Sequence, residues 1–157
     1  MSKDIRFKKG ANLNLIGKAE KSINNKSKSD LFALQPNDFF SLTPKLLVRE
    51  GDLVSKGSAV FHDKNNISIN FVSPVSGVVD KIIRGPKRRI ESVIIKKEGE
   101  RVLNHILPKK LNRDIIVKFL TKSGCWPFIK QRPYNVIANP NDTPKSILVS
   151  CFTSAPL

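Results

Sequence analysis

Four cations lie close together in the segment "RGPKRR", where Arg84, Lys87, Arg88 and Arg89 flank a Gly-Pro pair. Because Gly-Pro pairs favour turns, we predict that these side chains gather at one tip. Guanidinium and ammonium groups bind carboxylate and phosphate oxygens through charge-assisted hydrogen bonds. The segment is therefore the candidate contact site for an acidic protein surface or for anionic lipid, and the alternative is a basic loop that contacts only solvent.

The remaining polar residues give no clear sign of catalysis. His62 and His105 are 43 residues apart, and His62 and Asp63 would point to opposite faces of a strand. Ser73 and Ser76 in "SPVSG" do not have the Gly-x-Ser-x-Gly spacing of a nucleophile motif. The sequence contains no phosphate-binding glycine motif and no cysteine cluster. We identify no catalytic, cofactor-binding or metal-binding residue.

Aromatic residues and cations alternate near the C-terminus, where Trp126, Phe128 and Tyr134 are interleaved with Lys130 and Arg132. Such an arrangement can stack nucleic-acid bases. The prolines between these residues instead favour a fixed turn that packs its rings on the domain. We predict packing.

The net charge of +15, from 28 Lys and Arg against 13 Asp and Glu, favours anionic partners. Residues 81–113 contribute over half of it, with 11 basic and 3 acidic side chains. A nucleic-acid-binding protein is the alternative function, but charge alone supports it, and DNA binding would have to survive about 0.2 M salt to favour it. The N-terminus lacks a secretory apolar segment, and no run of residues is apolar and long enough to span a membrane.

A weak internal repeat indicates how these residues are positioned. "REGDLV" at 49–54 and "KEGERV" at 97–102 lie 48 residues apart, and each follows a strand-like run. Short apolar runs separated by turn residues lie between them. We predict an all-β unit over residues 42–103, in which the turns Gly51–Val54 and Gly99–Val102 are related by an approximate two-fold axis.

The flanking segments have other patterns. Residues 1–41 predict N-terminal strands and an exposed loop, the loop lying at 21–30. A helix is predicted after Asn112, with Gly124 as its stop. Its apolar face is expected to comprise Ile115, Ile116, Phe119 and Leu120. "SILVSCF" at 146–152 is typical of a strand buried on both faces, so residues 104–157 predict the beginning of an α/β domain. The fold class is therefore α+β.

The β unit resembles the biotinyl/lipoyl barrel-sandwich hybrid in its order of Gly-acidic turns, Asp-Lys pair and Pro-x-x-Gly-x-Val segment. In carrier domains of that type, the modified lysine lies at a hairpin tip about eight residues before the proline. Lys64 lies ten residues before Pro74 and is followed by Asn65 and Asn66, which we predict to be the turn centre because asparagine tolerates positive φ. We expect Lys64 to be unmodified; the alternative is a lipoyl or biotinyl carrier component.

A longer set of motifs resembles the N-terminal part of the A subunit of the bacterial Na+-translocating NADH:quinone reductase. The motifs occur in the family's order and extend beyond the β unit. They are "PNDF", "PKLL", "VREGDLV", "FHDK", "SPVSG", "RGPKR", "SGCWP", "QRPY" and "PNDTP".

This resemblance implies a peripheral subunit on the cytoplasmic face of the bacterial inner membrane, contributing to assembly and to the quinone side of a sodium-pumping complex. It implies other subunits as partners, indirect membrane association, quinone as a further contact and no nucleic acid. NAD, FAD, FMN, iron–sulfur and quinone are expected in the complex, and no flavin or metal in this chain. The family's subunit is far longer than 157 residues, so we expect the chain to continue and a piece of this length to be inactive alone.

Overall fold

The computed structural model describes residues 6, 16–17, 20, 22–23 and 28–150. These belong to two compact units, of which Ser29–Ile147 forms one, and Met1–Lys28 with Leu148–Leu157 forms the other. The strands predicted within residues 1–20 lie outside the described residues. The described part of the predicted loop at 21–30 is exposed to solvent.

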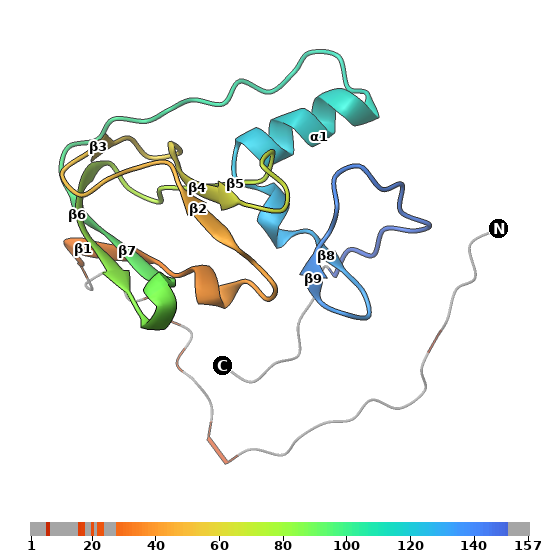
Figure 1. Ribbon diagram of the computed structural model, residues 1–157. Helices are drawn as coiled ribbons and strands as arrows, with labels where there is room; N and C mark the ends of the chain where they lie inside the picture. Colours follow the sequence, from red (N-terminus) through yellow and green to blue (C-terminus); the bar gives the residue numbers. More distant parts are fainter. Residues whose placement is uncertain (1–5, 7–15, 18–19, 21, 24–27, 151–157) are drawn as a thin grey trace. The chain divides into compact units, whose positions relative to one another are not determined.

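Antiparallel strands dominate the larger unit, and one α-helix lies between β7 and β8 in the chain (Figure 1). One sheet has the order β1-β7-β6-β3, a second has the order β2-β4-β5, and β8 pairs with β9. The strands are β1 (Leu31–Leu34), β2 (Pro44–Leu46), β3 (Leu53–Val54), β4 (Ala59–Asp63), β5 (Asn70–Val72), β6 (Gly77–Arg84), β7 (Ile90–Lys97), β8 (Lys130–Gln131) and β9 (Val136–Ile137). The helices are α1 (Arg113–Lys122) and the single 3-10 turns η1 (Pro36–Asp38), η2 (Pro86–Arg88) and η3 (Trp126–Phe128). The predicted α+β class is confirmed.

The two larger sheets share one apolar core. Phe61 and Phe71 pair across β4 and β5 with stacked rings whose centroids are 4.7 Å apart. Val79, Val93 and Ile95 complete the core from β6 and β7, and all three are fully buried. Other residues of these two strands also contact the core, and the outer end of β6 is mostly exposed.

Strand β1 extends this sheet beyond the predicted β unit of 42–103. Its residues pair antiparallel with β7, with Leu31 opposite Lys96 and Leu34 opposite Val93. The pairing places residues 31–34, which the sequence pattern assigned to the N-terminal segment, in the same sheet as β6 and β7. The division at residues 42 and 104 stays a prediction.

The two repeated turns lie in the same compact unit. Gly51 and Gly99 have left-handed φ values of 88° and 71°, which glycine adopts without strain. The segments that follow them meet, because Lys56 pairs in parallel with Val102 and its N–H donates to Arg101 O at 3.1 Å. Ser76 Oγ supports this junction by donating to the Arg101 carbonyl.

The loop after β4 differs from the predicted Asn-Asn turn. Two successive turns form there: Asn66 N–H donates to Asp63 O at 3.2 Å, and Ile69 N–H donates to Asn66 O at 3.1 Å. Neither Asn65 nor Asn66 has a positive φ. The side chains of Asp63 and Asn66 instead accept backbone N–H groups two residues ahead. The prediction of Asn65–Asn66 as the turn centre was wrong, because asparagine acts here through its side-chain oxygen.

Helix α1 agrees with the sequence in its ends and differs on its apolar face. Asn112 Oδ1 accepts the N–H of Ile115 at 2.8 Å, as expected of an N-cap, and Gly124 follows the helix with φ 76°. Val117 and Leu120 pack against the core. Ile116 is 38% exposed, so its predicted place on the buried face was wrong. The stripe that packs against the core therefore includes Val117, which the predicted face of Ile115, Ile116, Phe119 and Leu120 did not contain.

The predicted strand at 146–152 does not form in its described part. Residues 146–150 have no strand structure, and Ile147 and Val149 are 80% and 73% exposed. A strand buried on both faces requires neighbouring strands on its edges. Among the described residues, no strand pairs with residues 146–149, and residues 151 and 152 lie outside the described range.

Replacement of Gly124 with Ala is expected to destabilise the fold for two reasons. Its φ is left-handed, and a Cβ there would lie 2.6 Å from a methyl carbon of Val72. Gly51→Ala is the matched control, because Gly51 is also left-handed but a Cβ there meets nothing within 4 Å. We expect Gly51→Ala to lower the free energy of unfolding by about 1 kcal/mol and Gly124→Ala by about 2–4 kcal/mol, measured by urea denaturation. Equal losses would show that the Val72 contact relaxes without penalty.

Candidate functional site

The candidate cations lie where strands β6 and β7 connect, and residues 84–89 are named here the hairpin tip. Arg84 pairs with Ile90 at the last rung of the ladder. Gly85 N–H then donates to Arg89 O at 2.8 Å, and Arg89 N–H donates to Pro86 O at 3.2 Å. The chain therefore reverses between Gly85 and Arg89, and the structure brings the four predicted cations onto one short loop.

Lys87 and Arg88 both have a left-handed backbone, with φ values of 55° and 60°. They are the central residues of the turn closed by the hydrogen bond from Arg89 to Pro86. Turns with positive φ at both central positions strongly prefer Asn-Gly, because other side chains are strained there. Each residue of ordinary side-chain type costs about 1–2 kcal/mol in this conformation. The hairpin tip thus holds two long cationic residues in an unfavourable backbone.

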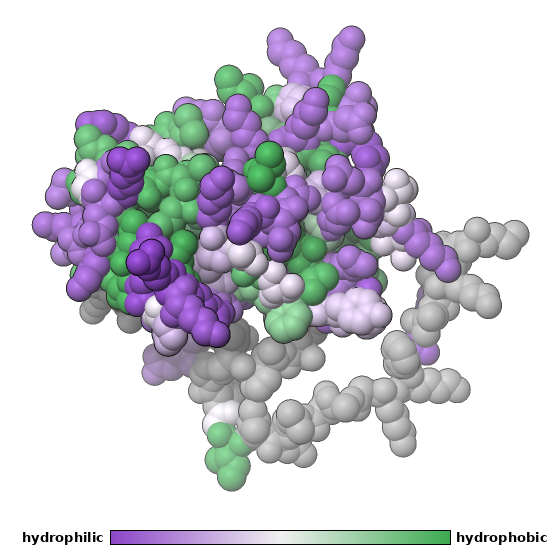
Figure 2. All heavy atoms as spheres, in the orientation of Figure 1, coloured by the Kyte–Doolittle hydropathy of each residue, from purple (hydrophilic) through white to green (hydrophobic). Residues whose placement is uncertain are grey.

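The four cations are exposed but differ in their contacts. Arg89 Nη2 donates to Asn37 Oδ1 of η1, a partner that no sequence pattern indicated. In the described part of the chain, the ion pairs are Lys96–Glu98 and Arg113–Asp114, so the hairpin tip takes part in neither. Figure 2 shows strongly hydrophilic side chains gathered over this end of the molecule. Arg84, Lys87 and Arg88 are thus available to an external anion.

One carboxylate lies at the base of the hairpin tip. Glu91, the second residue of β7, packs over Gly85 so closely that a Cβ at Gly85 would lie 1.9 Å from Glu91 Oε1. It forms no ion pair with the tip cations. An incoming anion would be repelled at this base and attracted at the outer end, where Lys87 and Arg88 lie.

The histidines and serines have structural hydrogen bonds. His62 is buried, with Nδ1 at 2.9 Å from Asp63 O, and His105 Nε2 lies 3.2 Å from Gly57 O. Ser73 Oγ donates to Val75 O at 2.5 Å. Over the described ranges, no group of three or more His, Cys, Asp or Glu side chains is placed to hold a metal ion.

The aromatic segment packs only in part. Trp126 is buried and its Nε1 donates to Ala138 O at 2.7 Å, which confirms packing for this ring. Phe128 is 74% exposed and contacts the domain only at one edge, where its ring centroid lies 6.2 Å from that of Phe39. Tyr134 is 72% exposed, so the predicted packing of this ring was wrong. Lys130 Nζ lies 4.9 Å from the ring centroid of Phe39, and burial lowers the pKa of this lysine.

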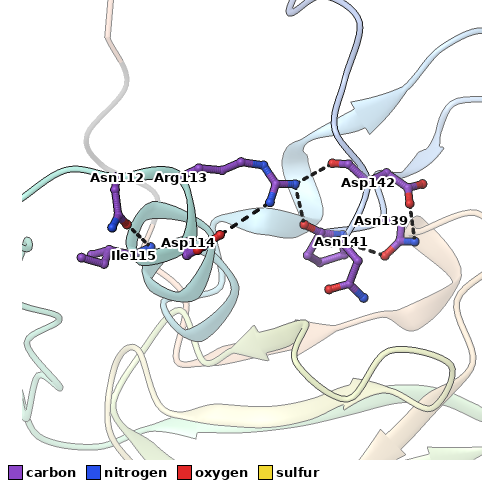
Figure 3. A network of polar contacts seen from close by, with 8 residues as sticks. Asn112, Arg113, Asp114, Ile115, Asn139, Asn141 and Asp142 are labelled. Carbon is purple, nitrogen blue, oxygen red and sulfur yellow. Dashed lines mark hydrogen bonds and ion pairs between the residues drawn. The ribbon is translucent and has the colours of Figure 1, made fainter.

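The start of α1 holds the loop at 139–142, as Figure 3 shows. Arg113 Nη2 donates to the carbonyls of Pro140 and Asp142 at 3.3 and 2.8 Å. Within the loop, Asn139 Nδ2 donates to Asp142 Oδ1 at 3.1 Å. No sequence pattern signals this network, because Arg113 and its acceptors are separated by the helix, η3 and the β8–β9 pair. The contacts of Arg113 with this loop are made to main-chain carbonyls and hold the loop against the helix.

Two family models match this chain in consecutive segments. The NqrA N-terminal barrel-sandwich hybrid domain matches residues 5–98, and the NqrA second alpha/beta domain matches residues 111–157. The chain belongs to the NqrA family. The barrel-sandwich fold and the family resemblance inferred from the sequence motifs are thereby confirmed, and the two larger antiparallel sheets are those of the NqrA barrel-sandwich domain.

Relatives of the NqrA family support this assignment along nearly the whole chain. The protein named as the A subunit of Na(+)-translocating NADH-quinone reductase in Histophilus somni (strain 129Pt) is 37% identical over 98% of this chain and 35% of its own length. Proteins of the same name from Glaesserella parasuis serovar 5 (strain SH0165) and Yersinia pestis are 34% and 32% identical over the same shares. The chain spans about a third of the length of these relatives.

Relief of the left-handed strain gives a stability prediction. Lys87→Asn with Arg88→Gly installs the residues that this turn prefers, so we expect the free energy of unfolding to rise by about 1–2 kcal/mol. Lys109→Asn with Lys110→Gly removes the same charge from an exposed connection without left-handed residues, and we expect no such gain. Urea denaturation measures both. A tip variant no more stable than its control would mean that the turn is unstrained.

Lys64 is expected to carry no prosthetic group. It is exposed in the first turn after β4, with its N–H bonded to Thr43 O at 2.7 Å, and it lies two residues further from Pro74 than the carrier spacing. A ligase that reads the position of a hairpin lysine would therefore find it misplaced. Intact mass spectrometry of protein from native cells checks this, and an added lipoyl or biotinyl mass would contradict it.

Proposed function

We propose that this chain acts in a Na(+)-translocating NADH-quinone reductase, as a peripheral subunit that contributes to assembly and to the quinone side of the complex. The observation that carries the proposal is the ordered match to two NqrA domains, together with relatives named as the A subunit of that reductase. The chain spans about a third of the length of those relatives. We therefore attribute the activity to the whole complex and not to this chain alone.

The proposed partners are the other subunits of the reductase. NAD, FAD, FMN, iron–sulfur and quinone belong to the complex, and this chain holds no flavin or metal of its own. We place the chain at the cytoplasmic face of the bacterial inner membrane, attached through other subunits. Helices long and apolar enough to cross a bilayer do not occur in the described portion.

The hairpin tip is the proposed contact for partner subunits or lipid head groups. Arg84, Lys87 and Arg88 are exposed and form no ion pair with the described residues, so they can form charge-assisted contacts without first breaking internal ones. Each exposed pair contributes only about 1 kcal/mol or less, so the contact depends on several cations acting together. Salt screens such pairs, and the contact should weaken as ionic strength rises.

Replacement of Arg84, Lys87 and Arg88 with Ala should weaken assembly without disturbing the fold. Arg89 is left in place because it contacts Asn37. We expect the variant to co-purify with the other subunits to a lesser extent at about 0.05 M salt, and the difference from the wild type to shrink toward about 0.2 M salt, because screening weakens the wild-type contact.

The matched control replaces Lys109, Lys110 and Lys145 with Ala, which removes the same charge from exposed positions elsewhere. Circular dichroism confirms that both variants are folded. Should the tip variant assemble as well as the control at every salt concentration, the hairpin tip is a solvated loop and its proposed role is wrong.

A further inference from the structure

We propose that the hairpin tip is a preformed element that binds carboxylate groups on an acidic surface of a folded partner subunit. The inference rests on the proposed function, because it names the chemistry of the partner that the tip would meet. Three observations carry it: the left-handed backbone at Lys87 and Arg88, the anchoring of the tip by Arg89, and the absence of ion pairs between the remaining cations and the described residues.

The backbone of the turn is more specialised than a solvated loop requires. Two successive cationic residues occupy positions that normally hold Asn and Gly. A loop exposed only to solvent would gain stability from those residues and lose nothing. Backbone conformations of this kind persist where a site needs a defined geometry. The cations at these two positions therefore indicate a partner whose binding depends on where they are held.

The tip is also held in place by the rest of the fold. Pro86 fixes the φ angle at the start of the turn, and two main-chain hydrogen bonds join Gly85 to Arg89 and Arg89 to Pro86. The side chain of Arg89 ties the tip to Asn37 of η1, so this arginine serves as an anchor. Arg84, Lys87 and Arg88 remain for the partner. A contact made by an ordered loop loses less conformational freedom on binding.

Carboxylates of a folded protein fit these observations better than lipid head groups do. Attraction of basic segments to an anionic bilayer depends on charge near the surface and needs no fixed backbone. Guanidinium groups instead bind carboxylates in a planar, two-bonded geometry that depends on where the arginine is held. Glu91 at the base of the tip would repel acidic groups there, so the favourable contact is confined to the outer end of the tip.

The test measures binding of the chain to the remaining reductase subunits, purified from a strain that lacks this gene. Lys87→Asn with Arg88→Gly removes two cations and keeps the turn, and we expect the Kd to rise about tenfold or more. Pro86→Gly keeps every cation and loosens the turn, and we expect the Kd to rise about threefold or more. Lys109→Asn with Lys110→Gly is the control, expected to stay within about twofold because rim charges contribute little.

The outcomes separate the proposed function from the inference. Failure of the wild-type chain to bind the subunits would overturn both. If the double variant Lys87→Asn with Arg88→Gly bound as tightly as the wild type, the inference alone would be overturned. This double variant gives a decisive result even if Pro86→Gly does not fold. If folded Pro86→Gly bound as tightly as the wild type, charge would act without preorganisation of the turn. The claim that the hairpin tip is preformed would then be wrong.

Vesicles containing phosphatidylglycerol test whether the hairpin tip binds lipid instead of a partner subunit. We expect Pro86→Gly to bind them as the wild type does, since its charge is unchanged. If Lys87→Asn with Arg88→Gly lost vesicle binding but bound the subunits normally, the tip would recognise lipid and the inference would be wrong.

Discussion

The pairing of β6 with β7 is the interaction on which the rest of the larger unit depends. Strand β7 lies inside the four-stranded sheet, between β1 and β6, and contributes Val93 and Ile95 to the core. Strand β6 contributes Val79 and pairs on its other edge with β3. Loss of the β6–β7 ladder would separate β1 from β3, and the core would lose one of the two sheets that enclose it.

The two ends of this ladder have different structures. At one end, the repeated turns meet, and the glycines at 51 and 99 adopt left-handed conformations without strain. At the other end, the same conformation is imposed on Lys87 and Arg88, which are poorly suited to it. Stability explains the residues of the first end. It does not explain those of the second, where the proposed contact with another molecule would give a physical reason for the cations.

Sequence reasoning succeeded where local chemistry decides the structure. The N-cap at Asn112 and the stop at Gly124 follow from backbone preferences of single residues. The turn predicted at Gly85–Pro86 forms just after it, with Lys87 and Arg88 at its centre. The four tip cations were brought together for the same reason, since they are close in sequence. Their role as a contact site stays a prediction.

Features that depend on distant partners were missed. The bond from Arg89 to Asn37 and the contacts of Arg113 with the loop at 139–142 join segments far apart in sequence. The face of α1 that packs on the core includes Val117 and leaves out Ile116, because the core determines which stripe is covered. The left-handed Lys87 and Arg88 also could not be foreseen, because propensity favours other residues there.

Zero-length carbodiimide cross-linking of the complex isolated from native membranes tests the proposed contact most directly. The reagent joins an amine to a carboxylate that already touches it, and mass spectrometry identifies the linked residues. We expect Lys87 to be joined to an Asp or Glu of a different subunit, with a yield well above that of Lys109 and Lys110, which are also exposed. Cross-links of Lys87 that are absent, or no more frequent than those of the two control lysines, would contradict a carboxylate contact at the hairpin tip.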